Sequence, residues 1–378
     1  MTTIVIAGGS IGGTTTASTL RTLGFEGNII VLDAEPYAYP RPSLSKVAMR
    51  GEHVLEPDGD EGIEMRRSTR VVAHDPERSR VTLIGGEQVA YDQLVIATGS
   101  AARRLAPQLP GEHVVRRLDD VIALRQRLST TRSALIIGGG LLGVEMSSAC
   151  RDLGLDVTLV ANRPPLQRAF GDHVATWIRE EAERAGVRIV DTVGPVIPFG
   201  DPVIGVELLD GRRFEADVVI TAIGDVPDVG WTPLGTSIGV LTDTEGWALP
   251  NVVVVGDARA TKLGDSVVRD PHWQAAIDGG RAAAHNLLGI DPPVARARYV
   301  WTECFGHVVK LAGHAVRGGP DRLLEGDPSG ARVIAWGESS PYECVISIDR
   351  RTPIPRLRSL AAVTSPNDRS LEHEGINK

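Results

Sequence analysis

Short apolar runs that lead into glycines mark the start of the chain. Residues 4–7 (IVIA) predict a buried strand, and residues 8–13 predict a glycine turn. Residues 14–23 predict a helix, and residues 29–32 predict a second buried strand. This order is typical of a β-α-β unit, in which a helix joins two parallel strands.

The same order returns from residue 134 onward. Residues 134–137 predict a strand, and residues 138–143 predict another glycine turn. A helix at residues 144–153 and a strand at residues 157–160 complete the second unit. The chain therefore carries an internal duplication, and the alternation of strands and helices predicts an α/β fold with two Rossmann-like parallel sheets.

The segments after each unit also resemble one another. Residues 81–84 and 94–97 predict strands around a Gly85-Gly86 turn. Residues 187–222 repeat this style with a hairpin turn at Asp210-Gly211. The strands predicted there are 187–190, 203–209 and 218–222.

The pattern changes in the last third of the chain. Residues 252–255 predict a buried parallel strand, and residues 273–288 predict an alanine-rich helix. From residue 299 the pattern alternates as in strands, for example at residues 345–348, which predicts a small C-terminal α+β domain. The tail after Ser365 is polar, and we expect it to be frayed.

Charge and composition exclude several classes of protein. The net charge of -8 comes without any block of Lys or Arg, so neither nucleic acid nor an acidic membrane is an expected partner. No apolar run reaches the ~20 residues of a membrane helix, and the N-terminus lacks a signal-peptide pattern. Cys150, Cys304 and Cys344 are far apart, which predicts neither a disulfide framework nor a metal site. We therefore expect a cytoplasmic protein.

The first glycine turn has the pattern of a dinucleotide-binding loop. Ser10 stands where the fingerprint has its middle glycine, and its small side chain lets the backbone approach a pyrophosphate. The helix that follows offers its amides and the positive end of its dipole to the phosphates. Asp33 ends the next strand, where an acid binds the adenosine ribose. The residues of this turn are Gly8, Gly9, Ser10, Ile11, Gly12 and Gly13.

The second glycine turn matches the fingerprint in full. Its residues are Gly138, Gly139, Gly140, Leu141, Leu142 and Gly143. The strand after it ends at Ala161, where an acid would bind the 2′-hydroxyl of NAD. Arg163 and Arg168 suit the 2′-phosphate of NADP, or they are solvated surface residues, so the choice between NADH and NADPH stays open. Two adjacent dinucleotides indicate a hydride passing from a nicotinamide to a flavin.

Further motifs lie between and after the two turns. Residues 40–46 read PRPSLSK, residues 91–99 read YDQLVIATG, and residues 221–228 read TAIGDVPD. Residues 299–303 read YVWTE. With the two turns, these motifs resemble the FAD-dependent ferredoxin reductases of bacterial oxygenase and cytochrome P450 systems. Putidaredoxin reductase, rubredoxin reductases and apoptosis-inducing factor are similar, and the resemblance covers about residues 3–360.

The resemblance implies that FAD binds at the first turn and NAD(P)H at the second. The residues implied to contact FAD are Gly8, Ser10, Ile11, Gly12, Gly13, Asp33, Arg41, Lys46, Val71, Arg116, Asp257, Trp273 and Trp301. Those implied to contact NAD(P)H are Gly138, Gly140, Leu141, Leu142, Gly143, Glu145, Arg163, Arg168 and Gly224. The implied domains are FAD-binding (1–109 and 225–290), NAD(P)H-binding (110–224) and C-terminal (291–378).

The resemblance also assigns roles. Arg41 and Arg116 can pair with the pyrophosphate, and Asp257 can accept hydrogen bonds from the ribityl hydroxyls. Lys46 and Glu145 are similar to a catalytic ion pair beside flavin N5, where the lysine stabilises negative charge on the reduced flavin. Trp301 would lie at the edge of the flavin, or it belongs to the core, as most aromatic residues do.

The cysteines decide between related chemistries. The turn at residues 40–46 contains no cysteine, so we do not expect thiol–disulfide exchange. Electrons then leave the flavin directly for a separate one-electron acceptor, such as a [2Fe–2S] or Rieske-type ferredoxin. We therefore interpret the chain as an NAD(P)H:ferredoxin reductase that serves an oxygenase. An NAD(P)H oxidase, a rubredoxin reductase and a redox-responsive flavoprotein scaffold are alternatives, and the sequence is compatible with a homodimer without deciding it.

Overall fold

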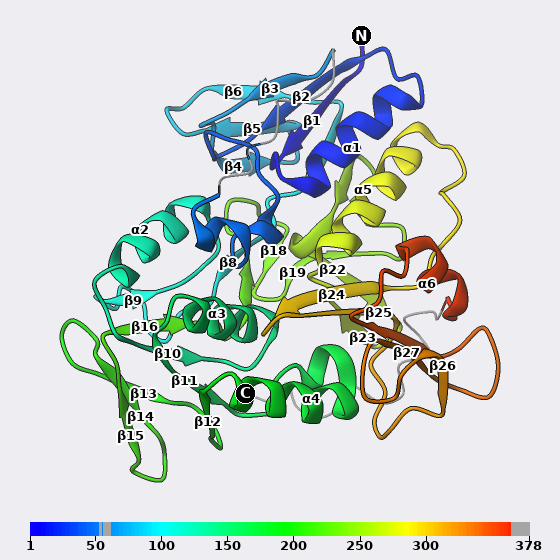
Figure 1. The fold of residues 1–378 in the computed structure, drawn as a ribbon. Coiled ribbons are helices and arrows are strands. Elements are labelled where there is room, and N and C mark those ends of the chain that lie inside the picture. Colours follow the sequence, from blue (N-terminus) through cyan, green and yellow to red (C-terminus); the bar gives the residue numbers. More distant parts are fainter. Residues whose placement is uncertain (53–54, 56–61, 364–378) are drawn as a thin grey trace.

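The computed structural model describes residues 1–52, 55 and 62–363, and Figure 1 shows how they are arranged. The first part is a six-stranded sheet with the order β20-β21-β7-β1-β2-β3. In it, β1 lies parallel to both β2 and β7, and β7 lies parallel to β21. Strands from the first hundred residues therefore share one sheet with strands near residue 250. Its strands are β1 (Thr3–Ala7), β2 (Asn28–Leu32), β3 (Glu64–Arg66), β7 (Gln93–Ile96), β20 (Trp247–Leu249) and β21 (Val252–Val254).

Both faces of this sheet are covered. Helices α1 (Ile11–Thr22) and α5 (Trp273–Leu288) lie side by side over one face, as Figure 1 shows, and bury Leu20 and Leu287 against Ile4 and Ile6. Alternate residues of the same strands point to the other face because side chains alternate along a strand. An antiparallel sheet of β4 (Val71–Asp75), β5 (Arg80–Leu83) and β6 (Gln88–Ala90) covers that face.

The second part repeats this architecture around a five-stranded sheet with the order β12-β11-β10-β16-β9. Helices α3 (Leu141–Asp152) and α4 (Gln167–Arg184) pack on one face of it. The antiparallel strands β13 (Ile197–Phe199), β14 (Gly205–Glu207) and β15 (Arg213–Glu215) pack on the other face. The sheet strands are β9 (Glu112–His113), β10 (Ser133–Ile137), β11 (Asp156–Ala161), β12 (Val187–Asp191) and β16 (Val218–Thr221). The duplication therefore extends from the glycine turns to whole layered units.

The third part is an antiparallel sheet with the order β24-β25-β28-β27-β26. Val300 and Cys304 share the core of helices α3 and α4, whereas Tyr299 faces the opposite side with Leu357 of helix α6. One face of this sheet thus packs on the second unit and the other face packs on α6. Its elements are β24 (Tyr299–Cys304), β25 (His307–Gly313), β26 (Arg322–Gly326), β27 (Arg332–Trp336), β28 (Cys344–Ile348) and α6 (Ile354–Leu360).

Shorter elements connect these parts. Helix α2 (Leu118–Leu128) precedes the second sheet, and strands β8 (Ser100–Ala102) and β17 (Asp225–Pro227) pair where the chain enters and leaves the second unit. A four-stranded sheet contains β18 (Gly235–Thr236), β19 (Gly239–Thr242), β22 (Arg259–Leu263) and β23 (Ser266–Val268). The 3-10 helices are η1 (Arg41–Ser43), η2 (Val47–Arg50) and η3 (Gly256–Ala258).

The predicted α/β class and the two parallel units are confirmed, with three local differences. Helices α1 and α3 begin three residues earlier than predicted, at Ile11 and Leu141, because glycines of both turns already belong to the first helical turn. The predicted strand at 203–209 shortens to Gly205–Glu207, because Val203 bonds to Pro110 and residue 204 turns back on Phe199. The tail after Ser365 lies outside the described residues. No helix in the described segments combines the length and apolarity that a bilayer requires.

The close packing of the glycine turns can be tested within one turn. A Cβ atom at Gly143 would overlap the carbonyl oxygen of Gly138, whereas a Cβ atom at Gly140 would meet nothing within 4 Å. We expect Gly143→Ala to lower the free energy of unfolding by about 1–3 kcal/mol, as overpacked sites do. Gly140→Ala is the matched control and should change it by about 0.5 kcal/mol or less. Urea unfolding measures both, and equal effects of the two variants would contradict the packing described here.

Candidate cofactor site

The two glycine turns lie at the carboxyl ends of β1 and β10. Gly8 (φ +116°) and Gly138 (φ +114°) adopt backbone conformations that favour glycine. Ser10 and Gly140 precede helices α1 and α3, and neither helix receives a side-chain cap bond. The first amides of both helices, which have no partner within the helix, are therefore available to the phosphates of a ligand. The predicted contacts in these first turns are Ile11, Gly12, Gly13, Leu141, Leu142 and Gly143.

The residue packed under the glycine turn is an acid in the first unit and an alanine in the second. A Cβ atom on Gly9 would lie 2.7 Å from the Cβ of Asp33, and one on Gly139 would lie 2.9 Å from the Cβ of Ala161. Asp33 and Ala161 are therefore structural counterparts. Burial raises the pKa of Asp33, while the Arg67 guanidinium that binds its carboxylate opposes this rise. An acid thus stands at this position in the first unit and an alanine in the second.

The predicted phosphate and ribityl residues form one connected group. Arg41 Nη1 donates to the backbone oxygen of Arg116 at 2.6 Å. Arg116 Nη2 binds Asp257 Oδ2 at 2.7 Å, and Ser100 Oγ donates to the same oxygen at 2.9 Å. Arg41 also pairs with Glu35 at 2.6 Å. The structure therefore brings Arg41, Arg116 and Asp257 together beside the first unit, although they are far apart in the sequence.

Lys46 and Glu145 form a buried ion pair with an Nζ–Oε1 distance of 2.8 Å, and their side chains are 13% and 7% exposed. Lys46 stands between η1 and η2, where buried Leu44 and Met49 anchor the loop in the core that α2 also joins. Glu145 lies on α3, in the turn after the second glycine motif. The pair therefore joins the two units, and the two residues are not separate surface charges.

The remaining predicted residues lie at the sheet edges or on the surface. Val71 begins β4 and is buried, and Trp273 begins α5 and is half-buried. Gly224 follows β16, where a Cβ atom would meet nothing within 4 Å. Arg163 and Arg168 are exposed. Their contacts with cofactors stay predictions.

Trp301 lies on β24 and stacks on Tyr299 with ring centroids 5.9 Å apart. The next residue, Thr302, donates to Glu145 Oε1 at 2.8 Å. Because neighbouring side chains of a strand point to opposite faces, Trp301 faces away from the ion pair. This geometry favours the core alternative for Trp301, and its place at the flavin edge stays a prediction.

Several residues around the site carried no assignment from the sequence. Ser45 donates to Glu145 Oε2, and Thr302 binds the other oxygen. Arg269 donates to the backbone oxygen of Asp257 at 2.8 Å, and its buried Nε has no partner in the part that the structure describes. Ser45 lies within the PRPSLSK motif and Thr302 within the YVWTE motif, but neither motif indicates a contact with Glu145. Arg269 contacts the site from a segment outside the motifs, so no spacing along the chain could indicate it.

A histidine lies at the start of α5. His272 precedes Trp273, and burial lowers its pKa to about 4, with nearby Arg298 acting in the same direction. The imidazole is therefore neutral at pH 7. The charged groups of the site are therefore the arginines, the acids and the Lys46–Glu145 pair.

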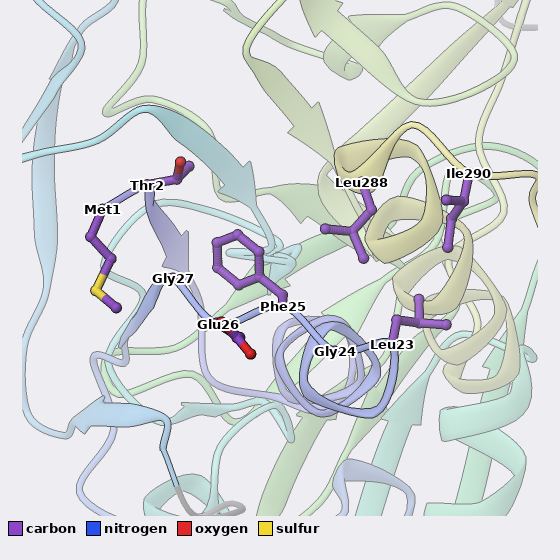
Figure 2. Close-up of a pocket in the computed structure, with 9 residues that line it drawn as sticks. All are labelled: Met1, Thr2, Leu23, Gly24, Phe25, Glu26, Gly27, Leu288 and Ile290. Carbon is purple, nitrogen blue, oxygen red and sulfur yellow. The ribbon is translucent and has the colours of Figure 1, made fainter.

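An open cavity of about 550 Å³ lies elsewhere on the first unit. Figure 2 shows that its walls come from residues 23–27 after α1, the end of α5 and the two residues before β1. The glycine turns follow the opposite, carboxyl ends of the strands, where ligands of open α/β sheets bind. The cavity is therefore separate from the candidate cofactor site. Its lining residues are Met1, Thr2, Leu23, Gly24, Phe25, Glu26, Gly27, Leu288 and Ile290.

Comparison with known proteins agrees with this geometry. Residues 2–280 match the pyridine nucleotide-disulphide oxidoreductase family, so the chain belongs to this family of oxidoreductases. It is 33% identical to the biphenyl dioxygenase system ferredoxin–NAD(+) reductase component of Paraburkholderia xenovorans (strain LB400), over 88% of this chain and 86% of that protein. It is also 33% identical to the ferredoxin reductase component of chlorobenzene dioxygenase from Cupriavidus sp. (strain PS12), over 96% of this chain and 92% of that protein.

Solved structures have the same fold. The ferredoxin reductase for the CYP199A2 system of Rhodopseudomonas palustris superposes with a TM-score of 0.82 at 25% identity, over 93% of this chain and 92% of that chain. The covalent putidaredoxin reductase–putidaredoxin complex gives a TM-score of 0.82 at 24% identity, over 97% of this chain and 95% of that chain. The two uncapped helix starts, the close-packed glycines and Asp33 fit the FAD and pyridine nucleotide of this family.

The role of Asp33 can be tested through cofactor retention. We expect Asp33→Asn to weaken FAD binding by about tenfold or more, because the ribose loses a charged acceptor. The ratio of flavin to protein absorbance after gel filtration measures the loss. Asp92→Asn is the control, since Asp92 is an exposed acid just before β7 of the same sheet and accepts from the Thr3 amide at 2.7 Å. Full retention of FAD by Asp33→Asn would refute the assignment.

Proposed function

We propose that the protein is an NAD(P)H:ferredoxin reductase that supplies electrons to an oxygenase. Bound FAD would accept a hydride from NAD(P)H and release electrons singly to the ferredoxin. The observation that carries the proposal is the buried Lys46–Glu145 pair, which joins the two dinucleotide units at 2.8 Å. The names of the relatives, ferredoxin reductases of dioxygenase systems, support the same reaction.

The ion pair is suited to hold positive charge beside a cofactor. In the described residues the Lys46 ammonium donates to Glu145 and, at 3.3 Å, to the oxygen of Pro42. An ammonium has three donors, so one remains for a ligand. Glu145 compensates the buried charge when no ligand is bound. Arg41 and Arg116 would bind the pyrophosphate, and Asp257 would orient the ribityl chain.

The buried thiols support a direct exit of electrons. Cys150, Cys304 and Cys344 are unpaired and buried. Burial raises the pKa of Cys304 to about 12, with the charge of Glu145 adding to the rise, so this thiol is protonated at neutral pH. A protonated, isolated thiol is a poor nucleophile and cannot relay electron pairs as a disulfide.

Other parts of the proposal concern partners and organisation. The acceptor is a [2Fe–2S] or Rieske-type ferredoxin, and the reductase acts in the cytoplasm, which agrees with its free cysteines. The proposal is compatible with a homodimer. The FAD domain comprises residues 1–109 and 225–290, the NAD(P)H domain residues 110–224, and the C-terminal domain residues 291–378. The pairing of β8 with β17 at the two crossings between units supports these boundaries.

A flavin-bleaching experiment tests the reaction. We expect NADH or NADPH to bleach the flavin band in stopped flow, and cytochrome c reduction to depend on an added [2Fe–2S] ferredoxin. Lys46→Met should slow bleaching by about 100-fold, the scale of a lost charge-stabilising group. Lys262→Met, at an exposed lysine of β22, is the control. Turnover with oxygen alone at the rate seen with ferredoxin would support an NAD(P)H oxidase instead.

Ala161 gives a separate test of nucleotide choice. We propose that the missing acid lets the second unit accept NADPH as well as NADH, because no carboxylate opposes a 2′-phosphate at Ala161. Ala161→Glu should lower kcat/KM for NADPH about tenfold relative to NADH. Ala161→Gln has almost the same shape without the charge and should leave the ratio within about twofold. An unchanged ratio in Ala161→Glu would show that the 2′ position lies elsewhere.

A further inference from the structure

The Glu145 carboxylate accepts hydrogen bonds from two other parts of the chain. Its Oε1 binds Lys46 Nζ at 2.8 Å and Thr302 Oγ1 at 2.8 Å. Its Oε2 accepts from Ser45 Oγ. Lys46 and Ser45 come from the loop of the first unit, Glu145 from α3 of the second and Thr302 from β24 of the third. One carboxylate thus connects all three parts of the molecule.

The hydroxyls in this group are as buried as the charges. Thr302 is 0% exposed, and Ser45 and Glu145 are each 6% exposed. A buried carboxylate costs much free energy unless donors compensate it. Each of the two hydroxyls donates a hydrogen bond to a carboxylate oxygen, which offsets part of this cost. Both oxygens of Glu145 therefore have a neutral donor, and only one of them has the lysine.

We propose that Thr302 and Ser45 are positioning residues, which hold the Glu145 carboxylate in the orientation that places Lys46 for the cofactor. Through the Thr302 hydroxyl, the C-terminal sheet then sets the geometry of a pair that belongs to the two nucleotide units. The proposal rests on the proposed function in one respect, since it takes this pair to act on the bound flavin.

Other ionisable groups near Glu145 do not replace these hydroxyls. Lys46 faces the carboxylate from the loop, and Cys304 faces it from the same side of β24 as Thr302. Burial raises the pKa of Cys304 to about 12, so the thiol stays neutral. If Thr302 loses its hydroxyl, Oε1 keeps the lysine alone, and only Lys46 and Ser45 orient the carboxylate.

Flavin bleaching by NADH without any ferredoxin tests the proposal. We expect Thr302→Val to slow bleaching about tenfold, the effect of one lost hydrogen bond to a charged group. Thr302→Ser keeps the hydroxyl and should restore the wild-type rate. Thr232→Val is the matched control, because Thr232 is also buried and bonds the ionisable His74 at 2.8 Å. A wild-type bleaching rate in Thr302→Val would overturn the proposal.

A thermodynamic cycle gives a readout that needs no activity. Unfolding is compared for the wild type, Thr302→Val, Glu145→Gln and the double variant. We expect the two changes to be coupled by about tenfold in the unfolding equilibrium constant, as for residues in one network. Ser45→Ala paired with Glu145→Gln should show the same coupling, and purely additive effects in both cycles would overturn the proposal. Bleaching by NADH without transfer to any ferredoxin would instead reject only the proposed function.

Discussion

The organisation of this protein depends on one buried charge pair and on the requirement that such a pair be compensated. Lys46 and Glu145 lie 2.8 Å apart at the place where two dinucleotide units meet. A buried ion pair is weak support for stability, because the cost of desolvation offsets much of the attraction. The pair nevertheless couples the first two units, because it joins the loop at Lys46 to helix α3. The C-terminal sheet contributes Thr302, whose hydroxyl donates a further hydrogen bond to the Glu145 carboxylate.

The two dinucleotide units have the same architecture but differ at the residue packed under the glycine turn. Both units present a close-packed glycine turn, an uncapped helix and a three-stranded antiparallel cover. Asp33 and Ala161 occupy the same place under their glycine turns, so only the first unit has a carboxylate there. A single side chain therefore distinguishes two otherwise similar units at this position.

The family is named for disulphide chemistry, but the cysteines of this chain serve as small core residues. Cys304 and Cys344 lie on the face of the C-terminal sheet that packs against α3 and α4, and Cys150 lies on α3 within the same core. Burial raises the pKa of all three thiols, which makes them poor nucleophiles. The sheet that carries two of them supplies a hydroxyl to the ion pair instead.

Local pattern by itself determined the α/β class, the two glycine turns, the strands beside them and Asp33, because these features depend on neighbours in the chain. It also placed Lys46 and Glu145 in recognisable motifs, whereas their contact required the fold. Only the tertiary structure decided that Arg67 binds Asp33, that Thr302 binds Glu145 and that Trp301 faces away from the pair. Periodicity shows which residues share a face, but which faces meet depends on the packing of distant units.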